Sequence, residues 1–200
     1  MEKKNQDVNY GEALRRIKKA KEENVNSLSL SSLGLEKIPE EICELTQLNE
    51  LYLNTNQISD ISPLSCLTKL IELDLGENKI THISALKSLR QLTSLYLNTN
   101  QISDITSLKV LTQLIQLGLS NNQITVISSL KALKKLNKLS LCDNQIRQFE
   151  LNLSAYPELN FLSLKGNPIR NIPNKIFDTE DGTDFDYNCF RGVRNHQNKT

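Results

Sequence analysis

Residues 48–58 read Leu48-Asn-Glu-Leu51-Tyr-Leu53-Asn-Thr-Asn56-Gln-Ile58, and the pattern LxxLxLxxNxI that they define returns five more times along the chain. The starts of these rows lie 22, 22, 22, 22 and 23 residues apart, at Leu48, Leu70, Leu92, Leu114, Leu136 and Leu159. A degenerate earlier row begins at Val25, and residues 51–61 are identical to residues 95–105. A fixed period of this length predicts an array of similar structural units.

Alternating apolar residues at the start of each row predict a short strand with one buried face. Leu51 and Leu53 should point inward while Tyr52 points outward, and later apolar positions such as Ile58 should close the coil. One coil cannot bury its own apolar side, but stacked coils can. We therefore predict an α/β solenoid of about seven coils over residues 25–177, curved as a right-handed superhelix with a parallel sheet on its concave face.

An asparagine recurs at the ninth position of each row, where the pattern points into the interior. A buried amide has to be hydrogen-bonded, and the asparagine side chain offers both donors and an acceptor. These residues are therefore predicted to form a structural ladder that ties the backbones of neighbouring coils together. The ladder comprises Asn56, Asn78, Asn100, Asn122, Asn144 and Asn167.

Both open ends of such an array need covers, because the end coils would otherwise expose leucine rows to water. Within an N-terminal segment of residues 1–24, a helix is predicted over 9–23, with Asn9 and Glu12 as a start resembling a capping box. Its apolar stripe consists of Ala13, Leu14, Ile17 and Ala20. Residues 178–200 are predicted to form the C-terminal cap and tail. The aromatic residues expected to close that end are Phe177, Phe185, Tyr187 and Phe190.

The rows resemble the leucine-rich repeat family, and the resemblance covers about residues 25–177. Rows of 22 residues with ISDIS-type turns are similar to the short class found in internalins and in phosphatase-regulatory leucine-rich proteins. The stretch EALRRIKKAKEENVNSLSLSSLGLEKIPEEI, residues 12–42, is similar to the N-terminal caps of bacterial Roco-type proteins. The resemblance implies an interaction protein, with a regulatory or scaffold role for a phosphatase or GTPase as the alternative. The chain departs from these relatives because we find neither an internalin export signal nor a GTPase domain after the repeats.

Composition excludes several classes of protein. The chain has 24 Lys and Arg against 23 Asp and Glu, a net charge of +1, which argues against a dedicated nucleic-acid binder. No stretch approaches the ~18 apolar residues of a membrane-spanning helix. The charged start of the sequence also lacks the apolar core of a signal peptide.

The four cysteines could serve as metal ligands, as disulfide partners or as free thiols. Cys43, Cys66, Cys142 and Cys189 form no CxxC pair and no cluster with metal-ligand spacing. Interpreted as isolated reduced thiols, they fit a reducing compartment. Together with the absence of an export signal, this predicts a cytoplasmic location.

The sequence contains few residues and no motif of the kind that catalysis requires. We therefore expect the chain to have no enzymatic activity and to bind no cofactor. His82 and His196 are the two histidines, and no GxSxG, P-loop or HExxH string is present. Asp60, His82 and Asp104 share the thirteenth row position, so they should lie side by side at intervals of about 5 Å. A weak metal site, or an enzyme built on this column, is the unfavoured alternative to a solvated charge ladder.

The outward positions of the strands provide the best candidate for a binding surface. In the first three full rows they carry four acids and no base, and two tyrosines flank an aspartate. A tyrosine buries area and hydrogen-bonds, which suits an interface anchor, and acids beside it favour a basic partner. The predicted protein-binding residues are Glu50, Tyr52, Asn54, Glu72, Asp74, Glu77, Tyr96 and Asn98. Gly118 and Ser120 should leave the middle of the face flat, so the contact is predicted to end near the fourth coil.

The opposite face of the array has the other charge. Row positions 18, 19, 21 and 22 of the four central rows carry seven bases and no acid: Lys69, Lys87, Arg90, Lys109, Lys131, Lys134 and Lys135. Such a surface either binds phosphates, an anionic membrane or an acidic protein, or is a solvated surface that keeps the protein soluble. It contains no aromatic residue for stacking on single-stranded nucleic acid. We therefore expect a monomeric, non-catalytic module that binds another protein on its concave face, with no nucleic acid as partner.

Overall fold

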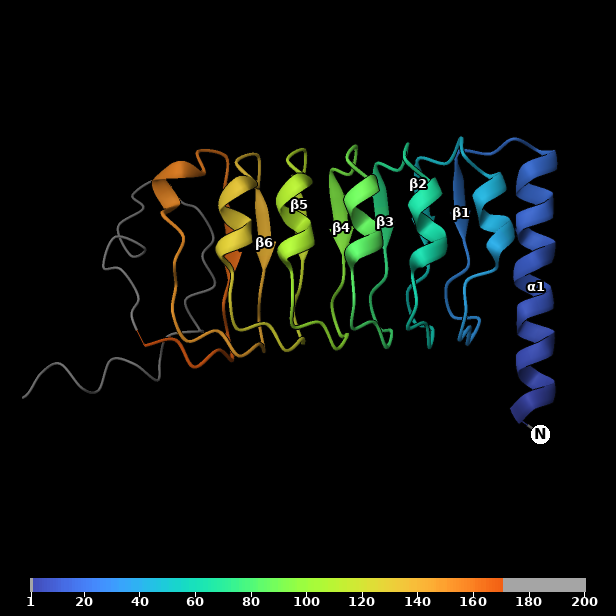
Figure 1. Ribbon diagram of the computed structural model, residues 1–200, viewed down its shortest axis with the longest axis horizontal. Coiled ribbons are helices and arrows are strands. Elements are labelled where there is room, and N and C mark those ends of the chain that lie inside the picture. The colour runs from blue at the N-terminus through green and yellow to red at the C-terminus, as the bar shows by residue number, and fades with distance from the viewer. Residues whose placement is uncertain (1, 171–200) are drawn as a thin grey trace, which may run out of the picture.

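Seven short strands form one parallel sheet in the computed structural model, which describes residues 2–170. Their order in the sheet is their order in the sequence (Figure 1). They are β1 (Ser27–Ser29), β2 (Glu50–Tyr52), β3 (Glu72–Asp74), β4 (Ser94–Tyr96), β5 (Gln116–Gly118), β6 (Lys138–Ser140) and β7 (Phe161–Ser163). Pairing is in register with the rows, so Leu51 lies beside Leu73 and Leu73 beside Leu95.

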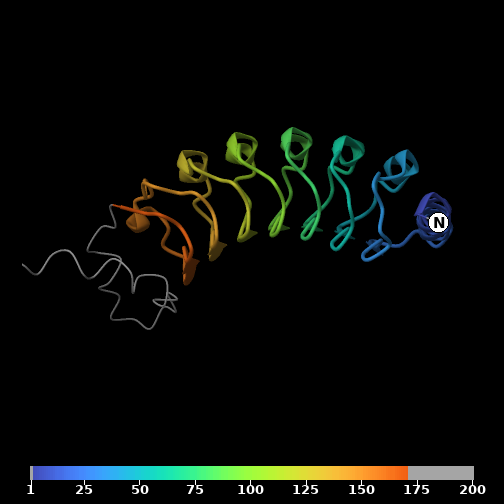
Figure 2. The same cartoon turned by 90° about the horizontal axis from the view of Figure 1, so that it is seen from below.

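Each of the first six coils carries one short 3-10 helix on the side opposite the sheet. These helices are η1 (Glu40–Glu44), η2 (Ser62–Cys66), η3 (Ser84–Ser88), η4 (Thr106–Val110), η5 (Ser128–Ala132) and η6 (Leu153–Ala155). A row of about 22 residues leaves little chain after the strand and its turn, and 3-10 helices suit such short segments. Figure 2 shows the 3-10 helices on the outer side of an arc and the strands on its inner side, so the sheet is the concave face.

The apolar residues of each row form one continuous interior. In the row that begins at Leu70, the side chains of Leu73, Leu75, Ile80 and Leu86 are all fully buried. The predicted inward positions and the predicted leucine-rich solenoid are therefore confirmed. Burying a leucine or isoleucine contributes about 1.5–3 kcal/mol, and each coil gains most of this burial only from its neighbours.

The row asparagines cross-link adjacent coils. The Nδ2 group of Asn78 donates to the Leu53 carbonyl of the preceding coil at 3.0 Å and to the Leu75 carbonyl of its own coil at 3.1 Å. Its Oδ1 atom accepts the Ile58 amide at 2.9 Å. Equivalent bonds are made by Asn56, Asn100, Asn122, Asn144 and Asn167. The first five of the six residues are buried, whereas Asn167 is half-buried.

The helix α1 (Glu2–Glu22) covers the N-terminal end of the array (Figure 1). It contacts β1 and η1. Ala13, Ile17 and Ala20 are buried, as expected of the inner stripe of a capping helix, while Leu14 is half-buried at its edge.

The start of this helix differs from the sequence prediction. Because α1 begins at Glu2, Asn9 lies inside the helix, and the capping-box interpretation of Asn9 and Glu12 is wrong. Glu12 instead accepts hydrogen bonds from Arg15 at 2.7 Å and from Arg16 at 2.8 Å, one helical turn further on. The predicted C-terminal cap over residues 178–200, with its four aromatic residues, lies outside the described residues.

Candidate functional site

Tyr52, Asp74 and Tyr96 stand side by side on the concave face. The register pairs Tyr52 with Asp74 across β2 and β3, and Asp74 with Tyr96 across β3 and β4. All three side chains are half-buried, because they alternate with the buried leucines of their strands. The structure thus brings together the three residues at the centre of the predicted surface.

Carboxylates surround the first tyrosine. The Tyr52 hydroxyl donates to Glu50 at 3.2 Å. Burial raises the pKa of Tyr52 to about 12, helped by the charges of Glu72 and Glu50. The pKa of Asp74 is also raised by burial and by Glu77, although the Gly76 amide donates to its carboxylate at 2.9 Å and opposes the shift.

The high pKa of Tyr52 predicts a late titration. Compared with the ordinary value of 10.0, a folded pKa of about 12 means that the stabilisation tied to the protonated phenol is complete below pH 10 and disappears between pH 10 and 12. In a tyrosinate absorbance titration, Tyr52→Phe should remove a component with a midpoint near 12, and a Glu50→Gln/Glu72→Gln variant should move that component to lower pH. A lost component that titrates near 10 would contradict the assignment.

The acidic side chains of this region lack an ion-pair partner among the described residues. Glu50 and Glu72 are half-buried and Glu77 is exposed. Thr55 donates to Glu77 at 3.2 Å. No Lys or Arg in the described part of the chain forms an ion pair with any of the three carboxylates. The surface therefore carries negative charge that a basic partner can neutralise.

Two asparagines hold fixed positions beside the tyrosines. Asn54 accepts a hydrogen bond from the Ser31 hydroxyl at 2.5 Å. Asn98 accepts the Ser120 amide at 3.0 Å, and its side chain lies over Gly118. Neighbouring coils thus orient the polar groups of this face before any partner arrives.

Beyond Tyr96 the face is hollowed, which corrects the expectation of a flat middle. The hollow has a volume of about 410 Å³. It is lined by Tyr96, Asn98, Gln116, Leu117, Gly118, Ser120, Asn121, Lys138, Ser140 and Phe161. Tyr96 and Phe161 contribute rings to this lining, and the side chain of Asn98 lies over Gly118. Sequence reasoning missed Lys138 and Phe161, although both occupy the outward row position of Glu50 and Glu72.

Asp60, His82 and Asp104 are exposed, and each side chain bonds to a residue one or two positions away in the sequence. Asp60 accepts the amide of Ser62 at 2.8 Å, and Asp104 accepts the amide of Thr106 at 2.8 Å, at the starts of η2 and η4. These bonds lower the pKa of both carboxyl groups. The imidazole of His82 contacts the Thr81 hydroxyl at 2.7 Å. Across residues 9–170, no three His, Cys, Asp or Glu side chains are grouped so that they could hold a metal ion.

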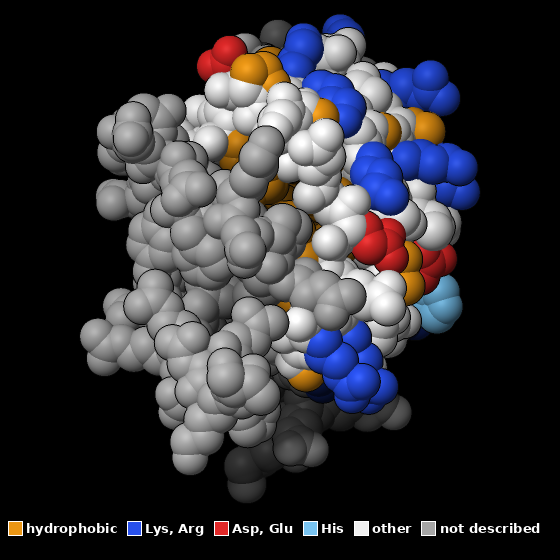
Figure 3. All heavy atoms as spheres, turned by 90° about the vertical axis from the view of Figure 1, so that its left-hand side faces the viewer, with side chains coloured by type: hydrophobic (Ala, Val, Ile, Leu, Met, Phe, Trp, Pro, Cys, Tyr) orange, Lys and Arg blue, Asp and Glu red, His pale blue; other side chains and the backbone are white. Residues whose placement is uncertain are grey.

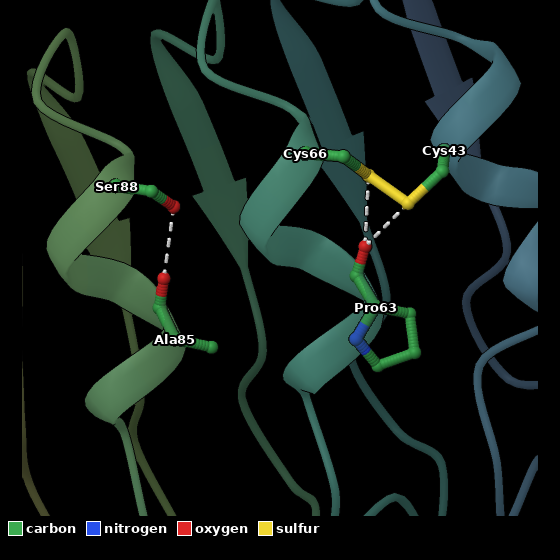
Figure 4. The surroundings of a disulfide bond; sticks show 5 residues. All are labelled: Cys43, Pro63, Cys66, Ala85 and Ser88. Carbon is green, nitrogen blue, oxygen red and sulfur yellow. Dashed lines mark hydrogen bonds between the residues drawn. A yellow bond between two sulfur atoms is a disulfide. The ribbon is translucent and has the colours of Figure 1, made fainter.

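Cys43 and Cys66 are joined by a disulfide, so the interpretation of all four cysteines as isolated thiols is wrong for this pair. The bond links η1 to η2 on the convex side (Figure 4). The two residues are 23 apart, which equals the distance from Val25 to Leu48, and they therefore occupy the same place in adjacent coils. Cys142 is a free thiol, and Cys189 lies outside the described residues. The predicted cytoplasmic location gains no support from this pair.

Basic side chains follow the outer side of the array. Figure 3, seen from the C-terminal end, shows Lys and Arg side chains gathered on the side of the 3-10 helices. Lys131 lies 3.9 Å from Glu150, and Lys135 donates to Gln113 at 2.6 Å. No helix within residues 2–170 is both long and apolar enough to cross a membrane.

Comparisons with known proteins match this geometry. The family described as Leucine Rich repeats (2 copies) matches residues 68–110 and 112–155. Leucine-rich repeat protein SHOC-2 of Danio rerio is 40% identical over 63 residues, which cover 31% of this chain and 11% of that protein. The chain therefore spans about a tenth of the length of this curated relative.

Two solved structures share the solenoid. An internalin (inlF) from Listeria monocytogenes str. 4b F2365 has a TM-score of 0.63 and 36% identity, covering 70% of this chain and 40% of that one. Internalin C2 (inlC2) from the same strain has a TM-score of 0.63 and 29% identity, covering 79% of this chain and 84% of that one.

Proposed function

Because the chain is a leucine-rich repeat protein, we propose that it is a non-catalytic interaction protein that holds a basic segment of another protein on its concave sheet. Tyr52, Asp74 and Tyr96 form the centre of the contact, and Glu50, Glu72 and Glu77 surround them. The supporting observation is the combination of half-buried tyrosines with carboxylates that lack a cation in residues 9–170. We further propose that the chain acts as a monomer.

Two physical effects favour binding here. Tyrosine rings bury area with few rotatable bonds, and their hydroxyls can exchange an internal acceptor for one on the partner. The coils already fix the backbone and the polar side chains, as the bonds of Asn54 and Asn98 show. Little conformational entropy is therefore lost on association. More of the contact energy then appears as affinity.

The proposal predicts a loss of affinity when the rings are removed. A Tyr52→Ala/Tyr96→Ala variant should bind the partner about thirtyfold more weakly or worse, because each of the two anchors contributes about 1–2 kcal/mol and the two losses add. The partner is first recovered by affinity purification and mass spectrometry, and its Kd is then measured by calorimetry. Recovery of a phosphatase or GTPase would identify the narrower regulatory role.

The matched control is Val126→Ala, which removes an exposed apolar side chain, 53% accessible, from the same row position as Asp60 and His82. It should leave the Kd unchanged. If the tyrosine variant keeps full affinity while Val126→Ala loses it, the partner binds elsewhere and the proposal is wrong.

A further inference from the structure

We propose that the concave face is electrically polarised along the solenoid, and that it takes a dipolar protein segment. Its basic residues lie over β2 and β3, and a carboxylate side chain enters the hollow beyond Tyr96 to pair with Lys138. This inference rests on the proposed function, since it specifies what the partner presents to the same face.

One column of outward residues carries the polarity. In-register pairing across β2 to β7 aligns, in order, Glu50, Glu72, Ser94, Gln116, Lys138 and Phe161. The column therefore passes from two acids through two neutral residues to a base and an aromatic ring. A uniformly basic partner would meet repulsion at the far end of this column, whereas a dipolar one is complementary along its whole length.

The hollow contains one charged group. Lys138 is the single ionisable cation or anion among its lining residues, and its side chain is exposed. No acid of residues 9–170 forms an ion pair with Lys138. Asp143, the first acid after Lys138 in the sequence, lies in the turn after the strand and does not line the hollow, and neither do Glu150 and Glu158. Lys138 could therefore pair with a carboxylate side chain of a partner protein.

The walls of the hollow suit the shaft of such a side chain. Tyr96 is held in place by a hydrogen bond from its hydroxyl to Gln116 at 3.0 Å. Phe161 is half-buried on β7, and the side-chain amide of Asn98 lies over Gly118 at the floor of the hollow. Because Lys138 is exposed, water screens a pair formed with it, and the pair contributes modestly to affinity.

The spacing of the charges on the partner follows from the sheet. Three strand spacings separate β3 from β6, a distance of about 15 Å. In an extended segment this corresponds to roughly four to five residues between the basic and acidic side chains. The probe is therefore a synthetic peptide with two arginines at one end, two glutamates at the other and a Gly-Ser spacer of about four residues. A second peptide carries glutamines in place of the glutamates.

Titration calorimetry at low salt should show that the Arg–Glu peptide binds about three- to fivefold more tightly than the Arg–Gln peptide. Lys138→Gln should abolish this difference, Lys138→Arg should keep it, and Lys109→Gln, the same charge change at a residue of η4 on the convex side, should leave it intact.

The outcomes separate this inference from the proposed function. If wild type binds both peptides equally and Glu72→Lys weakens both, the concave face binds basic segments but the hollow does not take a carboxylate, and the inference is overturned. If neither peptide binds, or if binding ignores both Glu72→Lys and Tyr96→Ala, the inference and the proposed function fall together.

Discussion

Replacing Asn100 by alanine is expected to lower the free energy of unfolding by about 3 kcal/mol. Asn100 is 9% exposed and donates to the carbonyls of Leu75 at 2.9 Å and Leu97 at 3.1 Å. It also accepts the amide of Ile80 at 3.0 Å. Alanine leaves that buried amide without an acceptor and removes a donor from each carbonyl. A buried polar group deprived of its partner is costly because water cannot replace the bond.

The matched control is Asn167→Ala, since Asn167 makes the same kinds of bond but is half-buried at the last coil of the ladder. Water can reach the freed groups there, so we expect a loss of only about 1 kcal/mol. Urea unfolding followed by circular dichroism gives both values. Equal losses for the two variants, or a loss below 1 kcal/mol for Asn100→Ala, would show that the ladder does not stabilise the array through buried bonds.

The ladder and the coil are predictable from sequence because they depend on local periodicity repeated many times. Leu95 and Leu97 flank Tyr96 in a strict alternation, which fixes the buried and exposed sides of β4. An amide at an inward position must find partners, and stacked coils supply backbone groups at a constant distance. Each row repeats the same pattern. A wrong assignment of buried and exposed positions in one row would therefore be recognised by comparison with the others.

The turn after each strand is not predictable by the same reasoning. The residue before each ladder asparagine has a positive φ, 58° at Thr55 and 56° at Thr99. A β-branched residue is an unusual occupant of this region, where glycine or asparagine is expected. The left-handed turn is kept because Asn56 and Asn100, which follow directly, bond to the coils on their N-terminal side. Tertiary bonds here outweigh a local preference.

The hollow was missed for a different reason. Its depth depends on the relative heights of side chains in four coils, from Tyr96 on β4 to Phe161 on β7. Each strand taken alone shows only an outward position without a side chain, which predicts a flat surface. Comparing the same row position between coils recovers Lys138 and Phe161, because the parallel register turns such a column into a line of neighbours.

The disulfide illustrates how a repeat changes the meaning of sequence distance. A separation of 23 residues suggests no contact in an ordinary chain, and a search for CxxC pairs or metal-ligand spacing ignores it. In a solenoid, one row length places two residues side by side on adjacent coils. Cys43 and Cys66 satisfy this condition, since the first row is itself 23 residues long.

Removing this disulfide is expected to lower the free energy of unfolding by about 3 kcal/mol, from the entropy of a closed loop of this length. The variant is Cys43→Ala with Cys66→Ser. Both sulfur atoms lie near the Pro63 carbonyl oxygen, at 3.2 and 3.0 Å, and one coil later Ser88 donates to the equivalent carbonyl at 3.0 Å (Figure 4). Serine at position 66 can therefore donate in the same way, so that the measured loss reports the missing bond rather than an unpaired group.

Reductant supplies the internal control for this prediction. Urea unfolding of the wild type in excess dithiothreitol should give the midpoint of the double variant, while the variant itself should not respond to the reagent. Mass spectrometry after alkylation, with and without reduction, counts the thiols involved. If the variant matches the oxidised wild type, or if reductant shifts both proteins equally, the link between η1 and η2 does not restrain the unfolded chain. A higher unfolding midpoint for the oxidised wild type than for the variant would show that the disulfide stabilises the first coils, beside the N-terminal helix. A covalent link is useful at this end, because a terminal coil has a neighbouring coil on one side only.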